Sequence, residues 1–110
     1  HFQMMYEASL FRDEAMARTI AQELTAIGSE GNGVSGPMVS YTGGGHIQYR
    51  LPIPNRVMRR LGNSVKQVTI YLASVEQDRT EELQEWMDRQ IADYIWLTPV
   101  GVHGAPARCR

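Results

Sequence analysis

The apolar residues of this chain repeat with two different periods, and the order of those periods limits the folds that the chain can adopt. Over residues 2–11 and 66–73 apolar and polar side chains alternate, which predicts two strands with one buried face each. Over residues 13–28 and 78–97 the apolar side chains recur every three or four positions, which predicts two amphipathic helices. The chain is therefore expected to combine strands and helices in one fold.

Asp13 decides where the first helix is expected to begin. A helix starting at Met4 would place Phe11 opposite the apolar face and Asp13 within that face, so the residues before Asp13 are assigned to the strand. Asp13 would then cap the free N–H groups of the first helical turn, and Gly28 would end the helix. The apolar face of this helix would consist of Met16, Ala17, Ile20, Leu24 and Ile27.

Glycine and proline divide the middle of the chain into short elements. The glycine run 43–45 predicts a hairpin between strands over residues 38–42 and 46–51, because glycine adopts positive φ without penalty. Asn55 would then cap a short helix over residues 56–61, which the following glycine would end.

In chain order these elements are β-α-β-β-α-β-α. The first six match a ferredoxin-like β-α-β-β-α-β sandwich, an α+β fold, and the seventh is an additional C-terminal amphipathic helix. A chain of 110 residues has room for a single domain, which we place at residues 2–99, followed by a loose tail over residues 100–110.

Charge is sorted along the sequence rather than mixed. Residues 31–75 contain no Asp or Glu, whereas residues 76–97 contain seven acidic and two basic side chains. The basic residues of the middle segment are Arg50, Arg56, Arg59, Arg60 and Lys66. Sorting of this kind bears on partners and association.

Two interpretations of these basic residues remain open. Together with Tyr49 they form a candidate anion or nucleic-acid (DNA or RNA) surface, because arginine and lysine bind phosphates and aromatic rings stack on bases. Alternatively, they face acidic side chains of the same chain or of a second copy. A sequence pI near 6.3 is low for a dedicated nucleic-acid-binding domain.

One stretch resembles the strand–proline–short helix–Leu-Gly–strand run of swapped-hairpin transcription factors of the AbrB and MazE kind. It consists of Gly45-His46-Ile47, Leu51-Pro52-Ile53-Pro54, Arg56-Val57-Met58-Arg59-Arg60-Leu61-Gly62 and Val68-Thr69-Ile70-Tyr71. The resemblance implies DNA binding and supports the nucleic-acid alternative.

His46 follows the glycine run and is a candidate general base or ligand-binding residue, with Tyr41 and Trp86 as further residues of a candidate pocket. Neither His46 nor His103 has another His, Cys or carboxylate at metal-ligand spacing. With no catalytic or cofactor motif either, the sequence predicts no metal and no cofactor and favours a non-enzymatic protein.

We therefore predict a small bacterial-type binding or interaction domain that acts as a homo-oligomer, most simply a dimer. Nucleic-acid binding through residues 50–66 and a small-molecule site or enzyme near His46 are the alternatives. Cys109, the only cysteine, and the lack of an apolar run long enough to span a bilayer favour the cytoplasm and no membrane partner.

Overall fold

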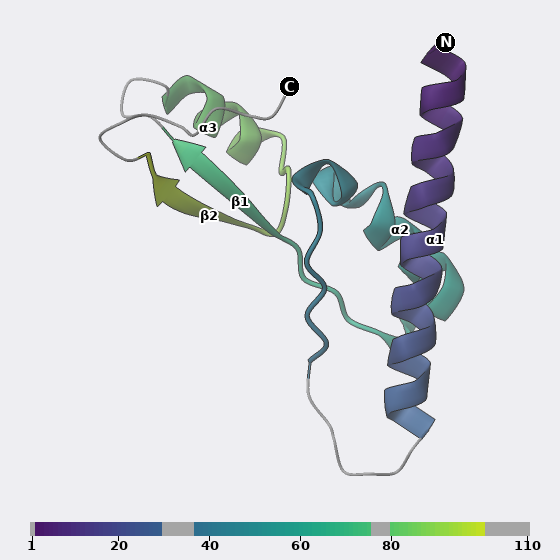
Figure 1. Ribbon diagram of the computed structural model, residues 1–110. Helices are drawn as coiled ribbons and strands as arrows, with labels where there is room; N and C mark the ends of the chain where they lie inside the picture. Colours follow the sequence, from purple (N-terminus) through teal and green to yellow (C-terminus); the bar gives the residue numbers. More distant parts are fainter. Residues whose placement is uncertain (1, 30–36, 76–79, 101–110) are drawn as a thin grey trace.

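The structure, a computed structural model, describes residues 2–29, 37–75 and 80–100 (Figure 1). The helices are α1 (Phe2–Ser29), α2 (Ile53–Leu61) and α3 (Thr80–Asp88), and the strands are β1 (Ile70–Val75) and β2 (Tyr94–Pro99). Three short 3-10 turns lie at Gly44–His46, Gln48–Arg50 and Gly62–Ser64. Helices thus account for most of the regular structure.

Helix α1 packs against α2 through small residues. Ala17 and Ala21, four positions apart, are buried, and Ala17 contacts the cluster formed with Ile53 and Val57 of α2. Positions four apart lie on one helix face, and an alanine there allows close approach of a second helix. The half-buried side chains packed against this cluster are Met16, Ile20 and Leu61.

Helix α2 owes its bounds to proline and glycine. Pro52 precedes the helix, and Pro54 lies in the first turn, where the missing N–H of proline breaks no helical hydrogen bond. Gly62 ends the helix with a φ of 61°, a value that residues with a side chain rarely adopt.

Strands β1 and β2 pair in parallel and are joined through α3, with Ile70 opposite Tyr94 and Leu72 opposite Trp96. Helix α3 covers one face of this two-stranded sheet, where the Tyr71 and Trp86 rings meet edge to face with centroids 5.7 Å apart. The opposite face is exposed and carries Ile70, Leu72, Tyr94 and Trp96. Figure 1 shows this β-α-β part beside the α1–α2 part.

The predicted ferredoxin-like sandwich is wrong, because that fold needs four strands and the described residues form two. Residues 2–11 belong to α1 rather than to a strand. Met4 and Tyr6, the expected buried side of that strand, are exposed on the helix. The segment is rich in Met, Glu, Ala and Leu, which are strong helix formers, and their propensity outweighs the alternating pattern.

The predicted hairpin around the glycine run is also wrong. Residues 38–42 pair with no strand in the described part of the chain, and residues 46–51 form 3-10 turns. Tyr49 and Arg50 have φ values of 57° and 60°, which are incompatible with an extended strand. The short helix is present, but it begins at Ile53 and therefore contains Asn55 instead of being capped by it.

The late helix is half as long as predicted. It ends at Asp88, Gln90 has a φ of 53°, and the aromatic and branched residues from Tyr94 onward form β2. Strand β1 exists but begins at Ile70. Val68, Ile70 and Leu72, the expected apolar face of this strand, are exposed, and Thr69 and Ala73 are buried. The expected start of this helix at residue 78 and the lone Cys109 lie outside the described residues.

No helix in the described part of the chain is both long and apolar enough to cross a membrane.

Candidate functional site

Asp13 and His46, thirty-three positions apart in sequence, form the most distinctive polar contact of the structure. The Oδ1 atom of Asp13 lies 2.5 Å from Nδ1 of His46. The Asp13 side chain is 8% exposed and the His46 side chain 24% exposed. A buried carboxylate requires a partner, because removing a charge from water is costly unless it is paired or hydrogen-bonded.

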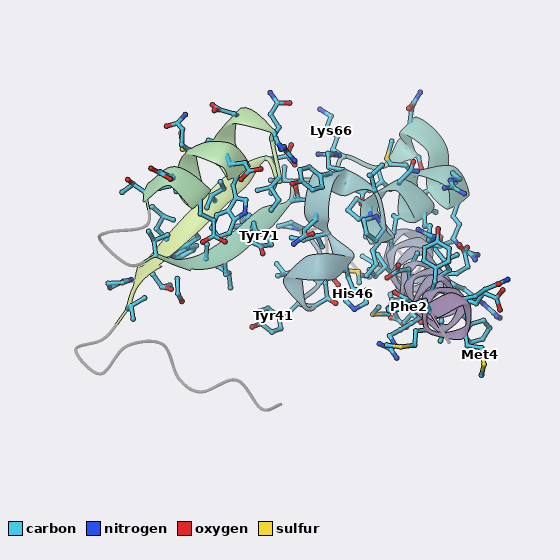
Figure 2. The ribbon with its side chains drawn as sticks, turned by 90° about the horizontal axis from the view of Figure 1, so that it is seen from above. Phe2, Met4, Tyr41, His46, Lys66 and Tyr71 are labelled. Carbon is cyan, nitrogen blue, oxygen red and sulfur yellow. The ribbon has the colours of Figure 1, made fainter. Side chains whose placement is uncertain are left out.

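Asp13 and His46 lie on different elements of the fold. Asp13 lies on the α1 face that packs on α2, one turn before Ala17, so its carboxylate points into the molecule. His46 ends the Gly44–His46 turn, which the hydrogen bond from the His46 N–H to the Gly43 carbonyl closes at 3.0 Å. Figure 2 looks down α1 and shows the His46 ring directed at this helix.

The second ring nitrogen of His46, Nε2, has no hydrogen-bond partner among the residues that the structure describes. With Nδ1 held by a carboxylate, Nε2 is the atom left for an external group. Metal-bound histidines commonly show this arrangement, in which the carboxylate fixes the ring orientation and raises the basicity of the ligand nitrogen.

The face of α1 that carries Asp13 continues towards the N-terminus as an exposed apolar strip. Phe2, Tyr6 and Leu10 follow the helical repeat from Asp13. Phe2 and Tyr6 are 88% and 64% exposed. Figure 2 shows Phe2 on the His46 side of the helix and Met4 on the opposite side. An apolar wall of this kind, continuous with a histidine, can hold a planar hydrophobic molecule.

The tyrosine expected beside His46 lies elsewhere. Tyr41 is 87% exposed and points away from His46 in Figure 2. It lines a small groove of about 190 Å³ with Ile70 and Leu72. Between Tyr41 and the turn, the Thr42 hydroxyl lies 3.9 Å from the sulfur of Met16. Trp86 is on α3, so the three predicted pocket residues do not share one pocket.

Three of the five predicted basic residues are paired with carboxylates of the same chain. Glu14 on α1 contacts Arg56 Nε at 3.1 Å and Arg60 Nη2 at 2.6 Å. The hydrogen bond from Arg60 lowers the pKa of Glu14 below its usual value, and the charges of Arg60, Arg56 and Arg59 add to this effect. Arg50 binds Asp93 at 2.6 Å.

The remaining members of the predicted surface are dispersed. Arg59 and Lys66 are exposed, and neither has an ion-pair partner within the described ranges. Tyr49 is 40% exposed, and its backbone N–H donates to the Ile91 carbonyl at 2.7 Å. The structure therefore does not assemble the six predicted residues into one exposed basic face.

Sequence reasoning missed Asp13 as the partner of His46. One signal in the sequence could have identified this pair. A helix that begins before Asp13 places the Asp13 carboxylate on an apolar face, where it needs a polar partner. Three or more metal-binding side chains do not cluster anywhere in the described residues, among which His46 is the only histidine.

Comparison with known proteins gives a family assignment. No curated protein and no solved structure matches the chain. A family model described as "Haem-binding uptake, Tiki superfamily, ChaN" matches residues 1–57. The match includes α1, the turn that carries His46 and the start of α2. It extends over more than half of the 110 residues, and the chain therefore belongs to this haem-binding uptake family.

Proposed function

We propose that this protein binds haem and that Nε2 of His46 would hold the haem iron. The single observation that carries the proposal is the Asp13–His46 contact, which leaves Nε2 without a partner among the described residues, within the segment that matches a haem-binding family. Haem iron, when bound, would supply a Lewis-acidic centre for a nitrogen ligand.

Asp13 prepares His46 for this role. Its carboxylate accepts a hydrogen bond from Nδ1–H, and in the uncharged ring this tautomer has its lone pair on Nε2. The same contact fixes the plane of the ring, because the carboxylate is held by a buried helix face rather than by a mobile loop. Asp13 is therefore a positioning residue, and His46 supplies the bond.

The exposed strip of α1 supplies the apolar contact that a porphyrin ring needs. Phe2, Tyr6 and Leu10 lie on the Asp13 side of the helix, and no described residue covers Phe2 or Tyr6. Burial of apolar surface stabilises a complex by roughly 25 cal/mol for each Å² removed from water, so aromatic side chains contribute most.

The other functions predicted from the sequence receive less support. Pairing of Arg50, Arg56 and Arg60 with carboxylates reduces the charge available for phosphates, which weakens the nucleic-acid alternative. Homo-oligomer formation and a cytoplasmic location stay predictions. The expectation of no cofactor rested on the lack of a sequence motif, and a single histidine positioned by a distant aspartate leaves no such motif.

Haemin titration followed by absorbance tests the proposal. The wild-type protein should give a saturable Soret band with one haemin bound per chain, and His46→Ala should abolish the saturable component. His103→Ala is the matched control, since it removes a histidine other than the one that Asp13 contacts, and it should titrate like the wild type. Equal binding by the His46→Ala and wild-type proteins would exclude His46 as the ligand.

A further inference from the structure

A second cavity lies in the β-α-β part of the chain. It occupies about 510 Å³ between α3 and β2. Cavities of about 300–1,000 Å³ are typical of small-molecule sites. Its apolar lining comprises Leu83, Trp86, Met87, Ile95 and Leu97. Met87 of α3 is exposed, and so is Leu97 of β2, although Leu97 lies on the side of the sheet that α3 covers. The helix is too short to close this side.

The polar residues that line the cavity are Arg50, Gln90 and Asp93. Arg50 and Asp93 are joined by the 2.6 Å contact between Arg50 Nη1 and Asp93 Oδ2. The same Oδ2 atom accepts hydrogen bonds from the backbone N–H and the hydroxyl of Thr69 at 2.7 and 3.1 Å. The charge of Asp93 is therefore well compensated.

Most N–H groups of the Arg50 guanidinium are not bonded to another side chain of the described residues. A guanidinium has five N–H groups, and only one of them is engaged by a side chain in the described part of the chain. The Arg50 side chain is 41% exposed at the cavity rim. Its planar fork matches the two oxygens of a carboxylate. A dianion is less suitable, because Asp93 stands beside the same guanidinium.

Residues with positive φ gather beside Arg50. Arg50 and Gln90, which both line the cavity, have φ values of 60° and 53°, and Tyr49 next to Arg50 has 57°. Non-glycine residues in this region are uncommon, and they gather at sites where a side chain must be aimed. The hydrogen bond from Tyr49 N–H to the Ile91 carbonyl, at 2.7 Å, joins the two strained segments.

We propose that the α3–β2 cavity binds an amphipathic monocarboxylate, with its carboxylate on Arg50 and its apolar chain or ring against Trp86 and Leu97. This site is separate from the proposed haem site, because none of its lining residues contacts Asp13 or His46. The ligand class follows from the lining of the cavity. The Arg50 guanidinium can bind one carboxylate, and the apolar side chains of the lining suit an apolar chain or ring.

Decanoate, kept below the concentration at which it forms micelles, is a suitable probe. The Trp96→Phe variant leaves Trp86 as the only tryptophan, so its fluorescence reports on the cavity alone. Decanoate should change this fluorescence in a saturable way. The uncharged 1-decanol should bind about tenfold more weakly or worse, as expected for the loss of a charge-assisted hydrogen bond. Equal affinities for decanoate and 1-decanol would overturn the proposal.

Two variants locate the site. Arg50→Gln should weaken decanoate binding about tenfold or more and should leave the affinity for 1-decanol unchanged. Met87→Glu places a negative charge at the exposed edge of the cavity without removing a buried group, and it should abolish decanoate binding in a folded protein. Arg59→Gln is a control that should bind like the parent. Undiminished binding by both Arg50→Gln and Met87→Glu would contradict the assignment.

Discussion

Asp13 is the residue on which the orientation of His46 most depends, because it is the only described side chain that forms a hydrogen bond with the His46 ring. Asp13→Asn keeps the shape of the side chain but removes the charged acceptor that holds Nδ1 of His46. We expect haem affinity to fall roughly 10–100-fold, the usual effect of losing the outer partner of a metal ligand.

Glu14→Gln is the natural control for that variant. Glu14 is the next residue on α1, but its carboxylate contacts Arg56 and Arg60 rather than His46. Parallel haemin titrations of the two variants should show a loss of affinity for Asp13→Asn alone. Similar losses in both would mean that the charge of the helix, and not the contact with His46, controls binding.

Asp93 gives the fold a predictable dependence on pH. The backbone N–H of Thr69 is the main cause of its lowered pKa, helped by the Thr69 hydroxyl and by Arg50, while burial opposes the shift. Because the pKa is lower in the folded than in the unfolded chain, the stabilisation is complete above the ordinary aspartate pKa of 3.8. It is lost as the pH falls from that value through the lower folded pKa.

Urea unfolding at a series of acidic pH values measures this contribution. The free energy of unfolding of the wild type should decrease more steeply below about pH 4 than that of Asp93→Asn, which has no carboxylate to protonate. The variant should also be less stable at neutral pH, since an amide cannot replace the charge facing Arg50. Identical acid limbs for the two proteins would show that Asp93 has an ordinary pKa in the folded state.

The same residues explain what the sequence could and could not reveal about the site. His46 was identified as a candidate because it follows a glycine run, but its partner was assigned to a helix cap. An unpaired carboxylate on an apolar helix face destabilises the fold. A prediction based on amphipathicity therefore begins the helix at Asp13 and does not extend it towards the N-terminus. The contact that compensates for the cost comes from thirty-three residues further along the chain, and local patterns carry no information about it.

At the scale of elements, the Gly44–His46 turn connects the His46 site to the sheet. A β-carbon added to Gly44 would lie 2.6 Å from Cε2 of Tyr71, the ring that packs against Trp86. Gly44→Ala should therefore displace this ring and destabilise the protein by about 1–3 kcal/mol, as overpacking generally does. Gly45→Ala is the matched control, because nothing lies within 4 Å of its added carbon. Thermal unfolding of both variants checks the difference, and equal melting temperatures would contradict it.

A helix or strand could be predicted from the sequence where a single local feature determined it. The helix before Gly62 and the strand containing Ile70 were found, because glycine ends helices and branched residues favour strands. The segments 2–11 and 89–97 were misassigned because apolar residues happened to match both periods. Their true states depend on partners: β2 forms only because β1 lies beside it, in parallel register from Ile70–Tyr94 onward.

The whole molecule is more open than its length requires. Its radius of gyration is 16.8 Å, whereas a compact domain of this length has about 13 Å. The α1–α2 part and the β-α-β part are connected by few contacts, among them Tyr49 N–H to the Ile91 carbonyl and the Gln48 amide to the Tyr71 hydroxyl at 3.4 Å. Two ligand sites in separate parts are compatible with this division.

Hydrogen exchange followed by mass spectrometry can separate the two proposed sites in one experiment. A ligand that binds only the folded state lowers the population of open states where it binds, so exchange slows in that part of the chain. Haemin should protect α1 and the Gly44–His46 turn, and decanoate should protect α3 and β2. Protection of α3 and β2 by haemin, with none in α1, would move the haem site to the cavity at Arg50. Uniform protection by either ligand would instead mean that the two parts unfold as one unit and that the open shape does not divide the chain energetically.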